Sequence, residues 1–515
     1  MKRSGAIASA CKLSLRVARR GEGRSSRPIS TSRYMRGRAT ALSFLRAHVL
    51  FAVVLEWAHL TRGIAYLQTG DARMSFAHPP LAKTLFAVPA LLSGDVDASP
   101  VYEFEAWETS MDPGAASLEL LRRDYEGARA ALGKARVVSG LLFLAAVVYL
   151  YRFVRLWGSA WQALLAAIVL GWNPSIIGHA RIATTDLPAA IFIAVAVCES
   201  LRAISPTARG IGWGRAGLAV GVALSVKYSA IFLILFVPLL LLAAALTQPK
   251  SLGGGTVRSR LVAGGLALVK VAVVALFVLN LSYSFQGTLC TVRELLAAPE
   301  PQYWISAGYG GELLETRTRL GGFPQWLRLP VPRTYLFGFV CVREQFHVGY
   351  PGGVFLESPN PDGDPRYFPV VMLLETPVWV LGLWCGGLVS LARAWRESTF
   401  DEKAMAVLVC ALLAVLIFSR LNMGIRHALP QVFLMSVLSV LLTRGHFPRG
   451  ARTGPHVVLA FAVLCGGASL ASATGNYIGW FNAFVSDERG LQSLRLGKIG
   501  GRTWWNSRTW SRKGG

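Results

Sequence analysis

The sequence predicts an all-α fold, a polytopic bundle of transmembrane helices, and three observations support this. The 515 residues are 53% hydrophobic and only 16% charged, whereas a soluble domain carries about a quarter charged residues. The apolar residues collect in runs close to the roughly 20 residues that a helix needs to cross a bilayer. Lys and Arg, which produce a net charge of +25, stand in short segments between these runs. That distribution indicates membrane topology and argues against nucleic-acid binding.

Eleven apolar segments are candidate spans, of which the first and fifth fit least well. In chain order they are 41–57, 137–156, 159–175, 185–203, 214–226, 229–247, 261–284, 368–394, 403–420, 428–443 and 456–474. With the N-terminus inside, each inner loop is basic or mixed, as the positive-inside rule requires. The outer side then carries two long loops, about 57–136 and 285–367.

The chain divides by composition into three parts. Residues 1–40 form a basic arm rich in Ser and Gly, which we expect to be disordered, although a transit peptide has a similar composition. Residues 41–484 form the transmembrane domain, and 485–515 form a basic, Trp-rich tail. No internal repeat is visible, and the two halves differ in hydropathy pattern. This asymmetry argues against a transporter, which remains an alternative.

The seven cysteines give no support for a metal site. They include no Cys-x-x-Cys pair and no Cys/His cluster, which zinc sites require. Cys290 and Cys341 fall in the same outer loop, and they could form a disulfide if that loop faces an oxidising compartment. The sequence implies no cofactor.

Ionisable residues gather at the outer ends of the predicted spans. They are Glu56, His59, Asp71, His78 and Lys83 after the first span, Arg181 and Asp186 between the third and fourth, Lys227 between the fifth and sixth, and Arg426 and His427 between the ninth and tenth. Each has an ordinary structural interpretation, such as a helix cap, a rigid turn or a snorkelling cation. Taken together, however, charges at span ends are costly and indicate function. Arg and Lys suit a lipid phosphate, and a nearby carboxylate suits a general base.

Five stretches that carry these residues resemble a known family in order and position. They are EWAHLTRGIAYLQTGDARMSFAHPPLAKTLFAVPAL, HARIATTDLPAAIF, ALSVKYSAIFL, RYFPVVMLLETPVWVLGL and SRLNMGIRHALPQV. From about residue 50 to residue 483, the chain resembles the GT-C membrane glycosyltransferases, in particular the dolichyl-phosphate-mannose protein O-mannosyltransferase-like branch and its bacterial relatives. The resemblance implies transfer of a sugar from a polyprenyl- or dolichyl-phosphate donor to a protein, lipid or glycan acceptor. It places the site on the non-cytoplasmic face of the plasma (inner) membrane, or of the endoplasmic reticulum in a eukaryote.

The resemblance also assigns roles, with one departure. The family's acidic pair falls on Leu55 and Glu56, so the first acid is absent. We therefore expect Glu56 or Asp71 to serve as the catalytic carboxylate. Arg426, His427 and Lys227 are expected to bind the donor phosphate, and His59, His78, Lys83, Asp186 and Arg181 to complete the site. A catalytically impaired paralogue that binds lipid phosphate or acts as a scaffold is the alternative.

Overall fold

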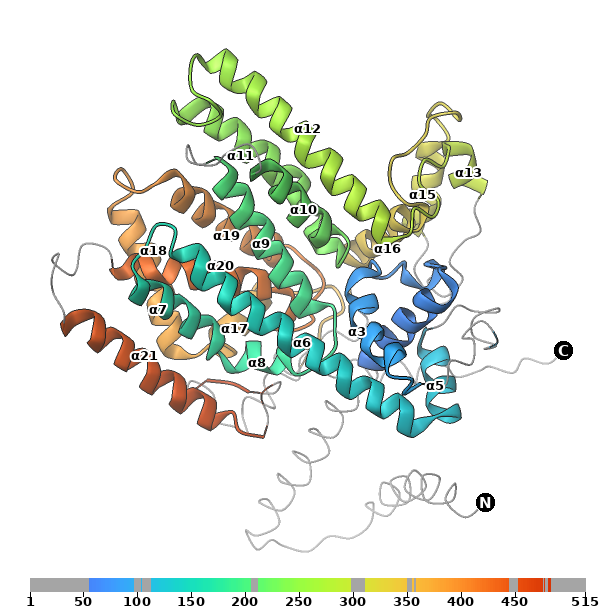
Figure 1. Cartoon of the computed structure of the whole chain (residues 1–515), viewed down its shortest axis with the longest axis horizontal. Coiled ribbons are helices and arrows are strands. Elements are labelled where there is room, and N and C mark those ends of the chain that lie inside the picture. The colour runs from blue at the N-terminus through green and yellow to red at the C-terminus, as the bar shows by residue number, and fades with distance from the viewer. Residues whose placement is uncertain are drawn as a thin grey trace, which may run out of the picture. The chain divides into compact units, whose positions relative to one another are not determined.

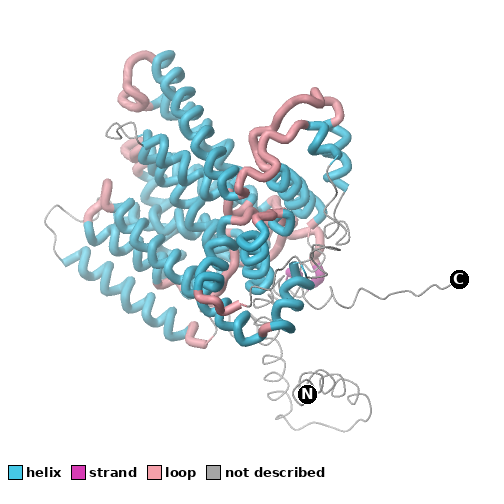
Figure 2. Tube along the Cα trace, turned by 45° about the vertical axis from the view of Figure 1, so that its right-hand side comes forward, coloured by secondary structure: helices cyan, strands magenta, loops and turns pink. Residues whose placement is uncertain are grey.

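The computed structural model describes the central part of the chain. The described residues are 55–96, 103, 113–204, 212–297, 311–349, 354–355, 358–443, 453–475, 477 and 480–482, all within the unit Ala47–Gly515. They are overwhelmingly helical, as Figure 2 shows in cyan. A two-stranded antiparallel ribbon pairs β1 (Val354–Phe355) with β2 (Ser358–Pro359). The all-α prediction is therefore confirmed, while the predicted arm and tail lie outside the described residues.

Each predicted span from 137–156 onward falls on helix. These helices are α6 (Tyr125–Val154), α7 (Ala160–Gly171) with α8 (Pro174–Ala180), α9 (Asp186–Ile204), α10 (Gly212–Leu224), η3 (Tyr228–Phe232) with α11 (Leu233–Thr247), α12 (Val257–Ser282), α17 (Tyr367–Leu374) with α18 (Val378–Arg393), α19 (Phe400–Ile417), α20 (Leu429–Leu438) with η5 (Ser439–Thr443), and α21 (Thr453–Ser472). The segment 41–57 lies mostly outside the described residues, which begin with a helix over 55–69.

Fewer of these helices have the length and composition of a full span. Five do, or up to seven if the bent pairs α7–α8 and α17–α18 each count as one, among the described residues. The eleven segments expected from apolar runs exceed this number. At about 1.5 Å per residue, the 13 residues of α10 reach only about 20 Å, short of a hydrocarbon core of about 30 Å. Multiple apolar helices remain consistent with an integral, multi-pass membrane protein.

The two predicted outer loops contain helices of their own. The first holds α3 (Leu81–Leu92) and α5 (Pro113–Arg123). The second holds α13 (Val292–Ala297), α15 (Gly311–Leu320) and α16 (Arg333–Val348). The interfacial helix expected directly after His78-Pro79-Pro80 is α3. Pro80 precedes its first residue, where a proline removes no helical hydrogen bond.

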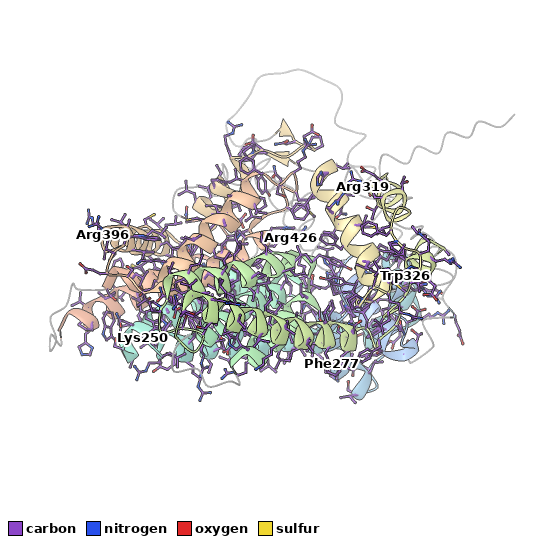
Figure 3. All side chains as sticks on the ribbon, turned by 90° about the horizontal axis from the view of Figure 1, so that it is seen from above. Lys250, Phe277, Arg319, Trp326, Arg396 and Arg426 are labelled. Atoms are coloured by element: carbon purple, nitrogen blue, oxygen red, sulfur yellow. The ribbon has the colours of Figure 1, made fainter. Side chains whose placement is uncertain are left out.

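The expected separation of inner and outer segments is visible within this unit. Figure 3 places Lys250 and Arg396, from predicted inner loops, toward one end and Arg319 and Trp326, from the second outer loop, toward the other. In Figure 1 the loop between α11 and α12 lies at the upper left, whereas α3, α5, α13 and α15 lie at the right. The basic inner loops and the helical outer loops thus occupy opposite ends of the bundle.

Helix α9 is the enclosed centre of the bundle. In its apolar stretch 83% of the residues are buried, compared with 22% in α12 and 11% in α21. It packs against α6, α10, α11 and α20. Because the first residue of α9 is Asp186, this packing brings a carboxylate to the middle of the protein at the outer end of the helix.

A sharp bend between α17 and α18 is held by a residue distant in sequence. The two helices meet at 118° across a short break, which leaves backbone carbonyls without helical partners. The side-chain amide of Asn482 donates to the carbonyls of Leu373 and Thr376, at 2.6 and 2.7 Å. The backbone N–H of Asn482 donates to the carbonyl of Leu374 at 2.9 Å. The segment after α21 therefore stabilises the entry to α18.

The disulfide considered for the second outer loop is not formed. Cys290 and Cys341 are both buried, free thiols. Cys290 lies in the turn before α13, where its carbonyl accepts a hydrogen bond from the N–H of Leu329. Cys341 lies on the buried face of α16. The two thiols therefore lie in different parts of the loop, one in a turn and one on a helix, and the disulfide between Cys290 and Cys341 is withdrawn.

Candidate active site

An ion pair at the start of α9 is the centre of the candidate site. The ammonium of Lys227 donates to Oδ1 of Asp186 at 2.5 Å, and the side chains are 10% and 9% exposed. Lys227 has extended backbone angles, φ −154° and ψ 142°, in the break between α10 and η3. This break in an apolar stretch turns the lysine toward the outer end of α9. Because both side chains are buried, their charges interact strongly.

The turn before α20 brings two more basic side chains to this pair. Gly424 has a φ of +87°, a value that favours glycine. Its N–H donates to the hydroxyl of Tyr367 at 2.7 Å. The turn continues into η4 (Ile425–His427), whose Arg426 and His427 both interact electrostatically with Asp186. The motif residues 420–427 are thus fixed against α17, and Figure 3 shows Arg426 between the two ends of the bundle.

Burial sets the protonation of His427. Desolvation, and then the charges of Lys227 and Arg426, hold the pKa of this imidazole well below its ordinary value. His427 is therefore neutral at pH 7 and has one donor and one acceptor nitrogen. Its ring centroid lies 6.5 Å from that of Phe368.

The helix 55–69 and the segment before α3 complete the arrangement. Lys83 is fully buried, and its ammonium donates to the backbone carbonyl of His78 at 2.6 Å. The rings of His59 and His78 lie 5.4 Å apart, centroid to centroid. Arg62, Lys83 and Lys227 all interact electrostatically with both histidines. These contacts link the first outer loop to the Asp186–Lys227 pair.

We call this set the polar cluster. It consists of His59, Arg62, His78, Lys83, Asp186, Lys227, Arg426 and His427. Seven of these residues were expected from the sequence to belong to a site, and the fold brings them together from four parts of the chain, which are residues 59–83, 186, 227 and 426–427. Arg62 was not among them. Its position one turn after His59, on the same helical face, was the available signal.

Three expected site residues have other surroundings. Glu56 is fully buried, accepts two hydrogen bonds from Arg136 at 2.8 and 2.6 Å, and accepts a third from the N–H of Ala183 at 2.8 Å. Asp71 forms an ion pair with its neighbour Arg73 near the surface. Arg181 is exposed, with its guanidinium carbon 5.2 Å from the centre of the Tyr477 ring. The roles assigned to these three remain predictions.

Three tyrosines whose rings pack together next to the cluster, which we call the tyrosine wall, were not predicted from the sequence. Tyr228 directly follows Lys227, and its ring centroid lies 5.0 Å from that of Tyr335 on α16. Tyr335 in turn lies 6.2 Å from Tyr283 at the end of α12. A Cβ added at Gly338 would approach the Tyr228 hydroxyl and the Phe76 carbonyl oxygen to 2.0 Å each. The second outer loop thus packs directly against the first, and no local pattern in the sequence indicated this.

The cluster contains hydrogen-bonding atoms that protein partners leave unused. Within the described ranges, Nε of Arg426, Nδ1 of His59 and Nδ1 of His78 are buried and have no hydrogen-bond partner. Both amide atoms of Asn422, in the same turn as Arg426, are also unpartnered. Buried polar atoms are normally satisfied, so this arrangement suits a polar ligand. In the same part of the chain, no group of three or more His, Cys, Asp or Glu is placed to hold a metal ion.

Comparison with solved structures gives distant resemblances. ArnT from Cupriavidus metallidurans bound to undecaprenyl phosphate has a TM-score of 0.44 and 16% identity, over 87% of this chain and 66% of that one. The Archaeoglobus fulgidus oligosaccharyltransferase tethered to an acceptor peptide has a TM-score of 0.45 and 16% identity, over 92% and 57%. The archaeal oligosaccharyltransferase AglB from Archaeoglobus fulgidus, in complex with an inhibitory peptide and a dolichol-phosphate, has a TM-score of 0.44 and 14% identity, over 88% of this chain and 56% of that one. This chain spans less than two thirds of each.

Comparison by sequence gives a match to one family. No protein of curated function matches the chain significantly. Residues 131–280 match the family described as dolichyl-phosphate-mannose-protein mannosyltransferase. The matched segment runs from α6 to α12 and includes the ion pair of Asp186 with Lys227. The family resemblance predicted from the motifs is thereby confirmed over residues 131–280, which are similar to the dolichyl-phosphate-mannose-protein mannosyltransferases.

Proposed function

We propose that the protein is an integral membrane glycosyltransferase. It transfers a sugar from a polyprenyl- or dolichyl-phosphate donor to a protein, lipid or glycan acceptor on the non-cytoplasmic face. The observation that carries this proposal is the excess of basic groups in the polar cluster. Asp186 neutralises Lys227 at 2.5 Å, while Arg426 adds a further cation whose buried Nε lacks a partner. A half-buried cation with a buried, unpartnered nitrogen is best satisfied by an anion.

The chemistry of the cluster fits a phosphate in particular. A guanidinium presents a planar fork of donors that matches phosphate oxygens, and Arg426 is in place to supply it. Lys227 is held in place by Asp186, which offsets its charge, so Arg426 carries the unneutralised positive charge beside this pair. When the bond between the sugar and the phosphate breaks, negative charge develops on the leaving phosphate. Fixed cations stabilise that charge more than they stabilise the donor, which lowers the barrier.

The position of the cluster supports action on the outer side. Its residues come from the outer ends of the predicted spans, whereas Lys250 and Arg396 mark the opposite, basic end (Figure 3). Basic loops remain in the cytoplasm. A donor whose phosphate lies at the outer membrane surface would reach the cluster with its sugar directed toward the outer loops.

The test is sugar transfer in proteoliposomes that contain the purified full-length protein. A panel of radiolabelled polyprenyl-phosphate sugars is supplied, and both donor consumption and labelled product are measured. Arg426→Gln should lower kcat/KM by about 100- to 1,000-fold, as is typical when a fixed electrostatic donor is lost. Arg396→Gln, at the opposite end, is the matched control and should retain full activity. Equal activity in both variants would refute the assignment to Arg426.

The second candidate is a non-catalytic protein that binds lipid phosphate. It is favoured by Leu55, which stands where the family has an acid, and by Glu56, whose carboxylate is fully occupied by Arg136 and Ala183. This candidate predicts saturable binding of polyprenyl phosphate that Arg426→Gln weakens, without turnover of any donor in the panel. Measurable transfer by the wild-type protein would exclude it.

A further inference from the structure

One face of the helix 55–69 carries a candidate for the catalytic group that replaces the acid absent at Leu55. Leu55, His59, Arg62 and Tyr66 recur at intervals of four, three and four residues, which places them on one helical face. His59 and Arg62 belong to the polar cluster. Because Leu55 lies one turn before His59, the side chains of these two residues are neighbours on the helical face that contributes to the polar cluster.

The rotation of this helix is fixed by its other contacts. Glu56 is held by Arg136 on α6 and by the N–H of Ala183. A Cβ added at Gly63 would approach the carbonyl oxygen of Lys83 to 2.1 Å, so the helix touches α3 backbone to backbone there. The helix can therefore not turn to bring Glu56 into the cluster in place of His59.

Among the described residues, the three carboxylates expected at the site are already engaged. The two oxygens of Glu56 accept three hydrogen bonds. Asp71 is paired with Arg73, and Asp186 is paired with Lys227. By contrast, His59 is 5% exposed, and its Nδ1 is buried without a partner among the described residues.

We infer that His59 is the general base of the transfer, occupying the role of the acid that Leu55 replaces. This inference rests on the proposed glycosyltransferase function. As the acceptor oxygen bonds to the anomeric carbon, the bond from that carbon to the donor phosphate oxygen breaks, and the phosphate leaves with the electron pair. The proton of the acceptor hydroxyl passes to the free nitrogen of His59. The resulting imidazolium is offset by the new negative charge on the polyprenyl phosphate, and it returns its proton to that phosphate or to water.

The surroundings of His59 keep it in the form that this step requires. Burial first, and then Arg62, Lys83 and Lys227, lower the pKa of the imidazole well below its ordinary value, while Asp186 opposes them. His78, the other ring in contact, is held neutral in the same way. At pH 7 His59 is therefore unprotonated and able to accept a proton.

The central test uses wild-type protein, His59→Gln and the double variant Leu55→Asp/His59→Gln in proteoliposomes. Using a donor that the wild-type protein turns over, His59→Gln should lower kcat by about 100-fold or more, since general bases contribute about 10²–10⁴. The KM for the donor should change less than threefold. The double variant should recover at least tenfold over His59→Gln, because an aspartate at position 55 supplies a base on the same helical face.

Azide separates catalysis from a structural role. It attacks the anomeric carbon without releasing a proton, so it needs no base. In His59→Gln, azide should therefore form glycosyl azide at a rate close to that of the wild-type protein, while transfer to hydroxyl acceptors remains low. His78→Gln is the matched control, with the neighbouring buried imidazole removed, and Leu55→Asp should not rescue it.

The wild-type protein supplies a further measurement that does not depend on the folding of a variant. Its kcat should be constant between about pH 6.5 and 8 and fall only at lower pH, because the pKa of His59 lies below its ordinary value of about 6.5. A kcat that rises steadily between pH 7 and 9 would overturn the inference. So would His59→Gln with activity within fivefold of the wild-type protein. Absence of turnover by the wild-type protein with every donor would instead refute the proposed function.

Discussion

Removing Arg136 should destabilise the protein more than removing its partner Glu56. The Glu56 carboxylate is 0% exposed and the Arg136 side chain is 40% exposed. In Arg136→Met, the carboxylate stays buried with the single hydrogen bond from Ala183. Stranding a buried charge in this way costs about 3–5 kcal/mol. In Glu56→Leu, the guanidinium can turn to water, and the main loss is the acceptor of the Ala183 N–H, about 1–3 kcal/mol.

The double variant makes this expectation sharper. Glu56→Leu/Arg136→Met contains no stranded carboxylate, so its cost should again be about 1–3 kcal/mol, the unsatisfied N–H of Ala183. Adding Glu56→Leu to Arg136→Met should therefore restore stability by about 2 kcal/mol, and subtracting the cost of Glu56→Leu alone as well gives a coupling energy of about 4 kcal/mol for this contacting pair. Arg129→Met on the same helix is the matched control. Its ion pair with Glu126 is 72% and 79% exposed, and its loss should cost less than about 0.5 kcal/mol.

The assay is reversible denaturant unfolding of each variant in mixed micelles, with midpoint and slope compared with those of the wild-type protein. The reasoning is refuted if Arg136→Met lies within about 1 kcal/mol of the wild-type protein, a change ordinary for surface substitutions. It is also refuted if the double variant is less stable than Arg136→Met. A Glu56→Gln variant with wild-type stability and no transfer would show that Glu56 is the catalytic carboxylate expected from the sequence.

Three further changes probe the packing around the site and the membrane face. Gly338→Ala should lower stability by about 1–3 kcal/mol in thermal unfolding, since the new Cβ meets the Phe76 carbonyl oxygen at 2.0 Å. The control Gly382→Ala, where a Cβ meets nothing within 4 Å, should be neutral or stabilising in the same measurement. Asn482→Ala should cost about 2–3 kcal/mol by the same measurement, because it removes both side-chain hydrogen bonds to the bend between α17 and α18. Lys270→Leu should favour membrane insertion of α12 by about 3 kcal/mol, because this exposed lysine lies near the middle of the helix. A glycosylation-mapping assay measures the insertion, and an unchanged value would contradict a position for Lys270 at the bilayer centre.

The apolar runs determined the helices almost without help from tertiary structure. The run predicted at 229–247 is found as helix over Tyr228–Thr247, and the run at 185–203 as α9, Asp186–Ile204. Such agreement is expected because a helix satisfies its own backbone hydrogen bonds and needs only a sustained apolar composition in the membrane. The same reasoning failed to give the number of full spans. A run of apolar residues does not reveal a bend such as the 118° angle between α17 and α18.

The outer loops were predicted least well. Their helix α16 packs against the first outer loop at Gly338, where an added Cβ would meet the Phe76 carbonyl oxygen, more than two hundred residues away in the chain. The same helix packs Tyr335 against Tyr228 of η3. Their sequence is amphipathic and interrupted by glycine and proline, so it has no periodicity strong enough to fix a partner. The wall formed by Tyr228, Tyr283 and Tyr335 therefore had no signal in the sequence.

By itself, the sequence determined that this protein is helical and which ionisable residues stand at the outer ends of its apolar segments. It also determined the family resemblance, which those residues carry. Only the tertiary structure decided how they are used. In the folded protein, Lys227 pairs with Asp186 and Glu56 pairs with Arg136. His59 keeps a nitrogen without a hydrogen-bond partner in the polar cluster. The physical reason is that charge types and helical periodicity are local properties of the chain, whereas the partner of a buried charge depends on which helices pack together.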